Sequence, residues 1–262
     1  MHNIVSKTLL MTKEQQIRTV VKTTLKDLSN GILKINNSDS FWHTCSFLKW
    51  MDKKHKNTLA LASTMQIRLG FAMERMAQRI AEINYVVKTN IDGKVLSEAQ
   101  KQSIINMTTD YKNRKYNPSI HDYNEWIQSC EDEFCSHKCD LHLYDKSTGK
   151  HTIVEIKASG NMDNKKSRAE KISLLEQRYI LGNSYDTFQD IDIRLGICYN
   201  YLGEGTEWHQ KRVQQFFADD EILVEKDFWN FIGKSKSAYS IIMDEWGKNF
   251  YRVNDAIEQI TQ

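Results

Sequence analysis

The chain has 262 residues, of which 40% are hydrophobic and 27% are charged, and its formal net charge at pH 7 is +2. This composition is ordinary for a globular protein, and with one proline and 11 glycines it permits long helices and argues against disordered linkers. The small net charge neither requires nor excludes a nucleic-acid partner, so local clusters of charge must decide.

Targeting signals and cysteines bear on where the protein works. No secretory signal opens the sequence, and no apolar run approaches the ~18 residues that a membrane span needs. We therefore expect a cytoplasmic protein with no membrane contact. The five cysteines are odd in number, which argues against a disulfide framework. Zinc binding by Cys130, Cys135 and Cys139 is an alternative, but their spacing is irregular for a zinc site, and reduced thiols are the preferred interpretation.

The first 120 residues are predicted to be mainly helical. Thr12 is expected to cap a first helix that ends near Gly31, and an aromatic-rich helix follows over residues 41–51. The longest helix, over residues 58–85, carries an apolar stripe at steps of three and four, which is typical of core packing. After a turn predicted at Asp92 and Gly93, a capping box at Ser97 opens another helix.

Glu74 is a candidate functional acid in the longest predicted helix. Its neighbours on one helix face are small, and small side chains allow another backbone to approach closely: Gly70, Ala77 and Ala81. Glu74 would then be pressed against a sheet. The alternative is an exposed Glu74 that pairs with Gln78 or Arg75.

The segment 139–157 is predicted to be a β-hairpin, because apolar residues alternate on both sides of a Lys-Ser-Thr-Gly turn at residues 146–149. Counting outward from the turn places Asp140 opposite Glu155. Lys157, two residues further on, shares the face of Glu155. Directly opposite residues have Cβ atoms only ~5 Å apart, and like charges there are destabilising. A bound divalent cation would explain the pair.

Its surroundings distinguish Glu155 from the other acids that precede a lysine by two residues. The pattern of an acid, any residue and a lysine begins at five positions, and only Glu155 stands inside an apolar strand, T-I-V-E-I-K. An ionised acid in such a strand must be paired or bind a metal to offset its desolvation. A structural ion pair between Glu155 and Lys157 is the alternative to the metal site.

A basic segment follows the hairpin and begins a helix. Four cations occupy its first turns: Lys165, Lys166, Arg168 and Lys171. Because the positive end of the helix dipole disfavours cations there, this pattern indicates a bound anion such as phosphate. A solvated basic turn is the alternative.

The remaining elements complete an α/β pattern. A strand is expected within residues 190–202, a helix over 206–217, a strand over 221–224 and closing helices from Phe228 onward. Helices first and alternating strands and helices afterwards predict an α/β core with a helical N-terminal portion.

Asp140, followed by Glu155-Ile156-Lys157 at the end of the next strand, resembles the active site of the PD-(D/E)xK nuclease superfamily. The segment R-L-G-F-A-M-E resembles the upstream helix that often supplies an additional acid, here Glu74. Three other segments are similar to Type II restriction endonucleases of the TdeIII kind, which cut around GGNCC: F-C-S-H-K-C-D-L-H-L-Y, A-S-G-N-M-D-N-K and F-W-N-F-I-G. The resemblance covers about residues 60–235, and Cys139 stands where the superfamily motif has proline.

The resemblance implies a restriction-endonuclease-like mixed β-sheet core flanked by helices. A single domain is expected over residues 1–262, with a mainly helical portion at 1–120, the catalytic core at 121–235 and a C-terminal helix at 236–262. The implied activity is Mg²⁺-dependent cleavage of double-stranded DNA at a short, GGNCC-like palindrome. A homodimer and a cognate DNA methyltransferase in the same system are the implied partners.

The resemblance also assigns roles to individual residues. Asp140, Glu155 and the Ile156 carbonyl would hold one or two Mg²⁺ ions, and Lys157 would orient or deprotonate the attacking water. Glu74 would bind a second metal, directly or through water. The four cations at the start of the following helix would hold the DNA backbone without reading sequence. Two alternatives stay open: a repair or structure-specific nuclease with the same chemistry, and a DNA-binding protein without catalysis.

Overall fold

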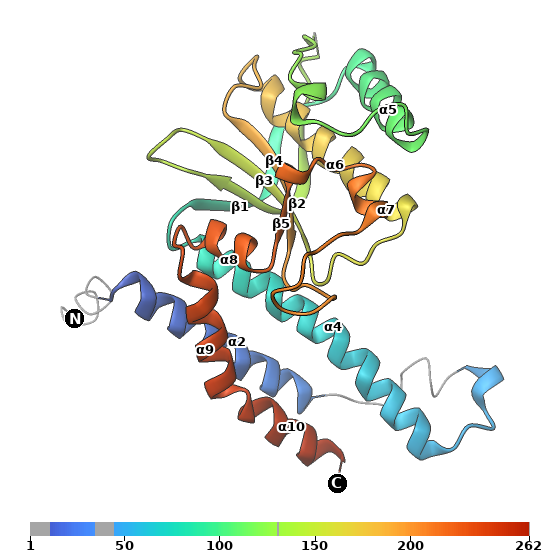
Figure 1. The fold of residues 1–262 in the computed structure, drawn as a ribbon, viewed down its shortest axis with the longest axis vertical. Helices are drawn as coiled ribbons and strands as arrows, with labels where there is room; N and C mark the ends of the chain where they lie inside the picture. The colour runs from blue at the N-terminus through green and yellow to red at the C-terminus, as the bar shows by residue number, and fades with distance from the viewer. Residues whose placement is uncertain (1–10, 35–44, 130, 262) are drawn as a thin grey trace. The chain divides into compact units, whose positions relative to one another are not determined.

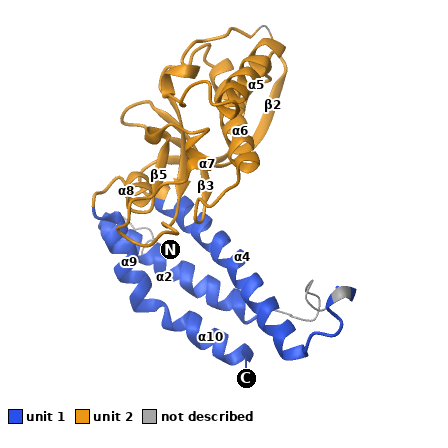
Figure 2. Ribbon diagram, turned by 45° about the vertical axis from the view of Figure 1, so that its right-hand side comes forward, with its two compact units in different colours: residues 1–80, 237–262 blue, residues 81–236 orange. Residues whose placement is uncertain are grey.

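The computed structural model describes residues 11–34, 45–129 and 131–261. The chain forms two compact units: unit 1 comprises residues 1–80 and 237–262, and unit 2 comprises residues 81–236 (Figure 2). The aromatic-rich helix predicted over residues 41–51 begins outside the described residues, and the part that is described contains the short 3-10 helix η2 (Ser46–Leu48). No helix in the described ranges is long and apolar enough to cross a membrane.

Unit 1 is helical, and helices from the two ends of the chain pack together in it. The described helices are α2 (Lys13–Ile32), α4 (Lys53–Ala81), α9 (Ala238–Asn249) and α10 (Tyr251–Thr261). The predicted cap at Thr12 is confirmed, because its side chain accepts from the Gln15 amide in a reciprocal capping box. The buried face of α2 carries Ile17, Val21 and Leu25, and α2 packs against α9 and α10.

Unit 2 is a mixed five-stranded sheet with helices. The strands lie in the order β1 (Val86–Lys94), β2 (Phe134–Tyr144), β3 (His151–Lys157), β4 (Ile191–Ile197) and β5 (Ile222–Val224). The first three strands pair antiparallel and the last three parallel. The helices are α5 (Glu98–Lys112), α6 (Asn164–Asn183), α7 (Lys211–Gln214) and α8 (Lys226–Ile232), with 3-10 turns η3 (Ile120–Tyr123) and η4 (Asp219–Glu221). The predicted α/β fold class is confirmed.

Helix α6 covers one face of the sheet (Figure 1). It contacts β1, β2, β3 and β4, and α5 packs on α6. The core between α6 and the sheet combines inward apolar residues of β3 and β4 with one side of the helix: Ile153, Ile191, Ile193, Leu195, Ile197, Leu174, Leu175 and Tyr179. On β4, a Cβ at Gly196 would lie 2.5 Å from the Phe228 ring, so α8 packs closely where this strand has no side chain.

The prediction of a turn at Asp92 and Gly93 is wrong, because both residues lie within β1. Gly93 has a packing role there: an added Cβ would lie 2.0 Å from the Ile180 carbonyl oxygen of α6. The glycine therefore permits a close approach between strand and helix, which is one of the uses of glycine in strands.

Two later elements are shorter in the structure than predicted. The helix expected over residues 206–217 is reduced to α7, and the strand expected within 190–202 ends at Ile197. Gly203 and Gly205 after the strand have φ of 110° and 75°, which is left-handed backbone and belongs to a loop. At the strand end, the buried Trp229 indole N–H donates to the Cys198 carbonyl at 2.8 Å.

Candidate active site

The β2–β3 hairpin has the register that the sequence predicts. The Asp145 amide donates to the Lys150 carbonyl at 2.9 Å and closes the turn. The paired residues run from Tyr144 opposite His151 to Leu141 opposite Val154. Continuing this register by one step places Asp140 opposite Glu155, as expected.

The two strands separate at Asp140, and the Asp140 side chain replaces a main-chain carbonyl as hydrogen-bond acceptor there. Backbone pairing between β2 and β3 ends at Leu141 and Val154. Beyond that pair, the Ile156 amide donates to the Asp140 carboxylate oxygen Oδ2 at 2.7 Å. This bond fixes the Asp140 carboxylate against β3, where it also interacts with the Glu155 side chain. The acids therefore meet where the hairpin opens.

Lys157 is held between two carboxylates. Its Nζ lies 2.5 Å from Glu155 Oε1 and 2.8 Å from Glu170 Oε1, and the three side chains are between 14% and 18% exposed. Glu170 comes from α6, which brings it over the sheet face that carries Glu155 and Lys157. We refer to Asp140, Glu155, Glu170 and Lys157 as the acid cluster.

Glu170 was not predicted from the sequence. Its place among four cations suggested a solvent-facing helix start, which hid the acid. The helical period held a usable signal: steps of four and three back from the buried Leu174 reach Glu170 and Lys171. Both residues thus belong to the side of α6 that faces the rest of unit 2.

The charges of the acid cluster are set by burial and by one another. Burial, followed by the charge of Asp140, raises the pKa of Glu155 to about 7. Burial also raises the pKa of Asp140. Burial alone would lower the pKa of Lys157, but Glu155 and Glu170 outweigh it and the pKa of Lys157 is raised. Lys157 is consequently a stable cation, and its single charge cannot neutralise three carboxylates.

This donor set fits Mg²⁺, a hard cation that binds oxygen ligands and keeps several of its waters. Full ionisation would leave two uncompensated negative charges in a partly buried site, which one divalent cation would balance. Among the described residues, no three His, Cys, Asp or Glu side chains converge as a complete metal cage. A site built on Asp140 and Glu155 with waters needs no such cage.

The cysteine alternative gains no support from the part of the chain that the structure describes. Cys130 lies outside that part. Burial, followed by the nearby charges of Asp140 and Glu155, raises the pKa of Cys139 to about 12, and burial raises the pKa of Cys135. Both side chains are thus protonated thiols at neutral pH in the metal-free protein, in line with the interpretation as reduced cysteines.

Glu74, the fourth predicted catalytic residue, lies on α4 in unit 1 and is exposed. Asp140, Glu155 and Lys157 belong to unit 2 and are brought together there. A role for Glu74 at the acid cluster stays a prediction.

The basic start of α6 carries its own acid. The N-cap is Asp163, whose carboxylate accepts from the Lys166 amide at 2.8 Å. Asp163 supplies the negative charge that a helix N-terminus favours, so the cations there do not require a bound anion. Lys165 and Lys166 are exposed. Arg168 is half-buried and donates to the Thr109 hydroxyl at 2.9 Å.

The prediction that Lys171 contacts DNA is wrong. Lys171 and Glu221 are both 0% exposed, and their charged atoms lie 2.5 Å apart. The Lys171 ammonium also lies 4.4 Å from the centre of the Tyr123 ring, and Tyr123 donates its hydroxyl to Glu221. This buried ion pair holds α6 to η3 and η4, and it leaves no cation for DNA.

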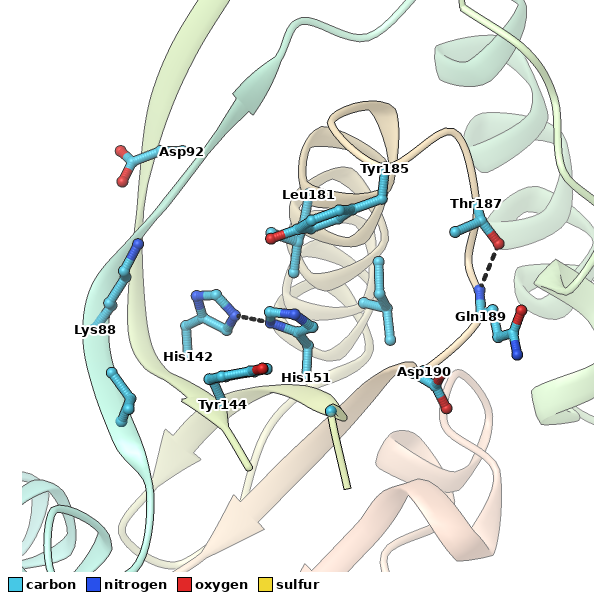
Figure 3. Close-up of a pocket in the computed structure, with 13 residues that line it drawn as sticks. Lys88, Asp92, His142, Tyr144, His151, Leu181, Tyr185, Thr187, Gln189 and Asp190 are labelled. Carbon is cyan, nitrogen blue, oxygen red and sulfur yellow. Dashed lines mark hydrogen bonds between the residues drawn. The ribbon is translucent and has the colours of Figure 1, made fainter. Parts of the chain in front are cut away.

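A separate cavity of about 610 Å³ opens at the turn end of the hairpin (Figure 3). His142 Nε2 and His151 Nδ1 lie 2.8 Å apart in it, and the ring of Tyr185 lies above this pair while Tyr144 lies below. Burial, followed by the charge effects of His151 and Lys88, lowers the pKa of His142 to about 4. None of the acid-cluster residues lines the cavity, so it is distinct from the candidate active site.

Comparison with known proteins supplies a family. A family model described as "Type II restriction endonuclease, HinfI" matches residues 13–247, which includes all of unit 2, most of unit 1 and every acid-cluster residue. Searches of curated proteins and of solved structures give no match to this chain.

Proposed function

The chain belongs to the HinfI family of type II restriction endonucleases, and we propose that the acid cluster is the centre at which it cleaves DNA. Membership makes the protein a DNA-cleaving hydrolase with DNA as its partner. The observation that supports the location is the fork in the hairpin, where Asp140 and Glu155 meet beside Lys157. Assignment to the PD-(D/E)xK superfamily is part of the same proposal and rests on the Asp140 and Glu155-Ile156-Lys157 pattern.

We propose Mg²⁺ as the cofactor, held by Asp140, Glu155 and the Ile156 carbonyl. The main-chain N–H and C=O of a strand residue point to the same side, and the Ile156 N–H points to Asp140. The carbonyl of Ile156 therefore faces the acids as well. Bound Mg²⁺ would lower the pKa of a coordinated water and offset charge on the phosphate.

Lys157 is proposed to act as a cation. Its raised pKa keeps a proton on the ammonium, so it is better suited to donate hydrogen bonds to water or phosphate than to remove a proton. Glu170 is proposed as a positioning residue, because its carboxylate holds the Lys157 ammonium at 2.8 Å from the side opposite the strand. Glu170 would thus keep Lys157 anchored when Glu155 serves as a metal ligand.

DNA backbone contacts are proposed for the exposed Lys165 and Lys166, with Arg168 as a third candidate from the same helix start. Glu74 remains a candidate for a second metal. A short palindromic site implies a two-fold homodimer that places one acid cluster on each strand. A restriction enzyme also implies a cognate methyltransferase that protects host DNA, and a cytoplasmic location beside that DNA.

The GGNCC-like recognition sequence is the finer part of the proposal, and it rests on the resemblance to enzymes of the TdeIII kind. Incubation of plasmid DNA with the full chain and Mg²⁺, followed by sequencing of the fragment ends, tests it. We expect discrete fragments whose two strands are cut at symmetry-related positions within one short site. A smear or cutting only at junctions would favour a repair nuclease, and intact plasmid would favour a protein that binds without cleaving.

A further inference from the structure

We infer that a groove between α2 and α4 in unit 1 binds a phosphate of the DNA backbone. The groove, called the arginine groove here, is lined by Arg68, Arg75 and Arg79 of α4 and by Thr24, Asp27 and Gly31 of α2. The inference rests on the DNA-cleaving function and extends it, because it assigns a DNA contact to the helical unit. No residue of the groove belongs to the acid cluster.

Spacing and charge make the arginine groove basic. Arg68, Arg75 and Arg79 follow one another at steps of seven and four, so they project from one side of α4. Asp27 pairs with Arg79, whose Nη1 lies 3.3 Å from the carboxylate. In the described part of the chain, Arg68 and Arg75 form no ion pair, which leaves two guanidinium groups for an external anion.

Two buried polar atoms of the groove lack hydrogen-bond partners, which indicates that the groove lacks a ligand. The Thr24 side chain is 2% exposed, and its hydroxyl has no hydrogen-bond partner. Two other threonines of the same helix bond back to the preceding turn, Thr19 to the Gln15 carbonyl at 2.8 Å and Thr23 to the Thr19 carbonyl at 2.9 Å. Thr24 does not, although leaving a buried hydroxyl without a hydrogen bond destabilises a protein. Arg68 Nε is likewise buried without a partner.

The space and the donors suit a phosphate group. The cavity is about 90 Å³, well below the roughly 300–1,000 Å³ of pockets for drug-sized ligands. Gly31 makes room for one guanidinium, since an added Cβ would lie 2.8 Å from Arg68 Nη1. Planar guanidinium groups match phosphate oxygens in paired hydrogen bonds. The DNA substrate supplies such a phosphate in its backbone. Arg75 is exposed, so a DNA strand can reach it.

The experiment compares duplex binding by full-length variants in EDTA, where no cleavage occurs, over a range of salt concentrations. We expect Arg75→Ala to weaken binding roughly tenfold at low salt and to reduce the slope of log K against log[salt] by about one, as the loss of one phosphate contact requires. Arg68→Gln should behave in the same way. Arg252→Ala is the matched control, because Arg252 is an exposed arginine of unit 1 outside the groove.

Thr24→Val keeps the side-chain shape and removes only the unpaired hydroxyl. It should leave the salt slope unchanged, weaken duplex binding a few-fold and not lower the melting temperature of the free protein. Arginine variants that bind duplex as tightly as Arg252→Ala does would overturn the inference. A melting temperature that rises with inorganic phosphate in the unaltered chain but not in Arg75→Ala, while duplex binding is equal in both, would assign the groove to free phosphate and overturn the DNA contact.

The cleavage assay separates this inference from the proposed active site. With Mg²⁺ and limiting DNA, Arg75→Ala should cleave more slowly in proportion to its weaker binding, whereas Arg252→Ala should cleave as fast as the unaltered chain. Loss of duplex binding in the arginine variants of a chain that proves unable to cut DNA would support the arginine groove and count only against the acid cluster.

Discussion

At the scale of single residues, the charge on Glu155 controls the acid cluster. Its pKa is raised to about 7 because it is buried and faces Asp140. Mg²⁺ needs the ionised carboxylates and must compete with protons for them. We expect the cleavage rate at limiting Mg²⁺ to rise as pH increases through about 7, and the midpoint to move to lower pH when Mg²⁺ is increased. A pH midpoint of cleavage that does not change with Mg²⁺ concentration would contradict this competition between metal and protons.

The same pKa gives a prediction for stability without metal. A carboxyl whose pKa is raised from 4.5 to about 7 on folding stabilises the protein fully below pH 4.5, and this stabilisation is lost as pH rises through about 7. Glu155→Gln should therefore be more stable than the unaltered chain at pH 8 in EDTA, by on the order of 1–3 kcal/mol, with a smaller difference at pH 5. Urea unfolding of both proteins at pH 5 and pH 8 measures this difference in the free energy of unfolding.

At the scale of elements, α6 carries two kinds of lysine that the sequence does not distinguish. Lys171 is buried against Glu221, whereas Lys166 is exposed. Lys171→Ala would leave a buried carboxylate unpaired, so we expect a loss of about 3–5 kcal/mol in the free energy of unfolding. Lys166→Ala should leave stability within about 0.5 kcal/mol. It should instead weaken DNA binding for all sequences and reduce the salt dependence.

Denaturant unfolding together with salt-dependent DNA binding checks both lysine variants. The folded fraction of Lys171→Ala should show the salt slope of the unaltered chain. A reduced slope in this variant would reinstate Lys171 as a phosphate contact, and a changed recognition sequence in Lys166→Ala would show that Lys166 reads bases.

The hairpin could be predicted from its sequence because its rules are local. Alternation fixes which residues share a face, the four-residue turn fixes the register, and the opposition of Asp140 and Glu155 follows. Strand β1 could not be predicted in this way, because Gly93 signals a turn unless the Ile180 carbonyl packed against it is known. The ion pair between Glu170 and Lys157 could not be predicted either, because only the docking of α6 on the sheet brings the two side chains together.

At the scale of the whole molecule, periodicity shows which helix faces are apolar but not what covers them. The first helix was predicted, yet the helices that pack against it are α9 and α10 from the other end of the chain. Arg18 of α2 pairs with Asp244 and Glu245 of α9 at 2.6 and 3.1 Å, and no local rule joins residues so far apart. The division into units 1 and 2 follows from such contacts, whereas the α/β class follows from element order alone.

Cleavage of plasmid DNA by Asp140→Asn and Lys157→Ala, measured beside the unaltered chain with Mg²⁺, tests the acid cluster most directly. Duplex binding in EDTA provides the control for folding and affinity. Both variants should bind duplex about as tightly as the unaltered chain, while their cleavage rates fall by at least about 10³-fold, because the metal ligand or the cation at the phosphate is missing. Unchanged cleavage in either variant would place the chemistry elsewhere on the chain.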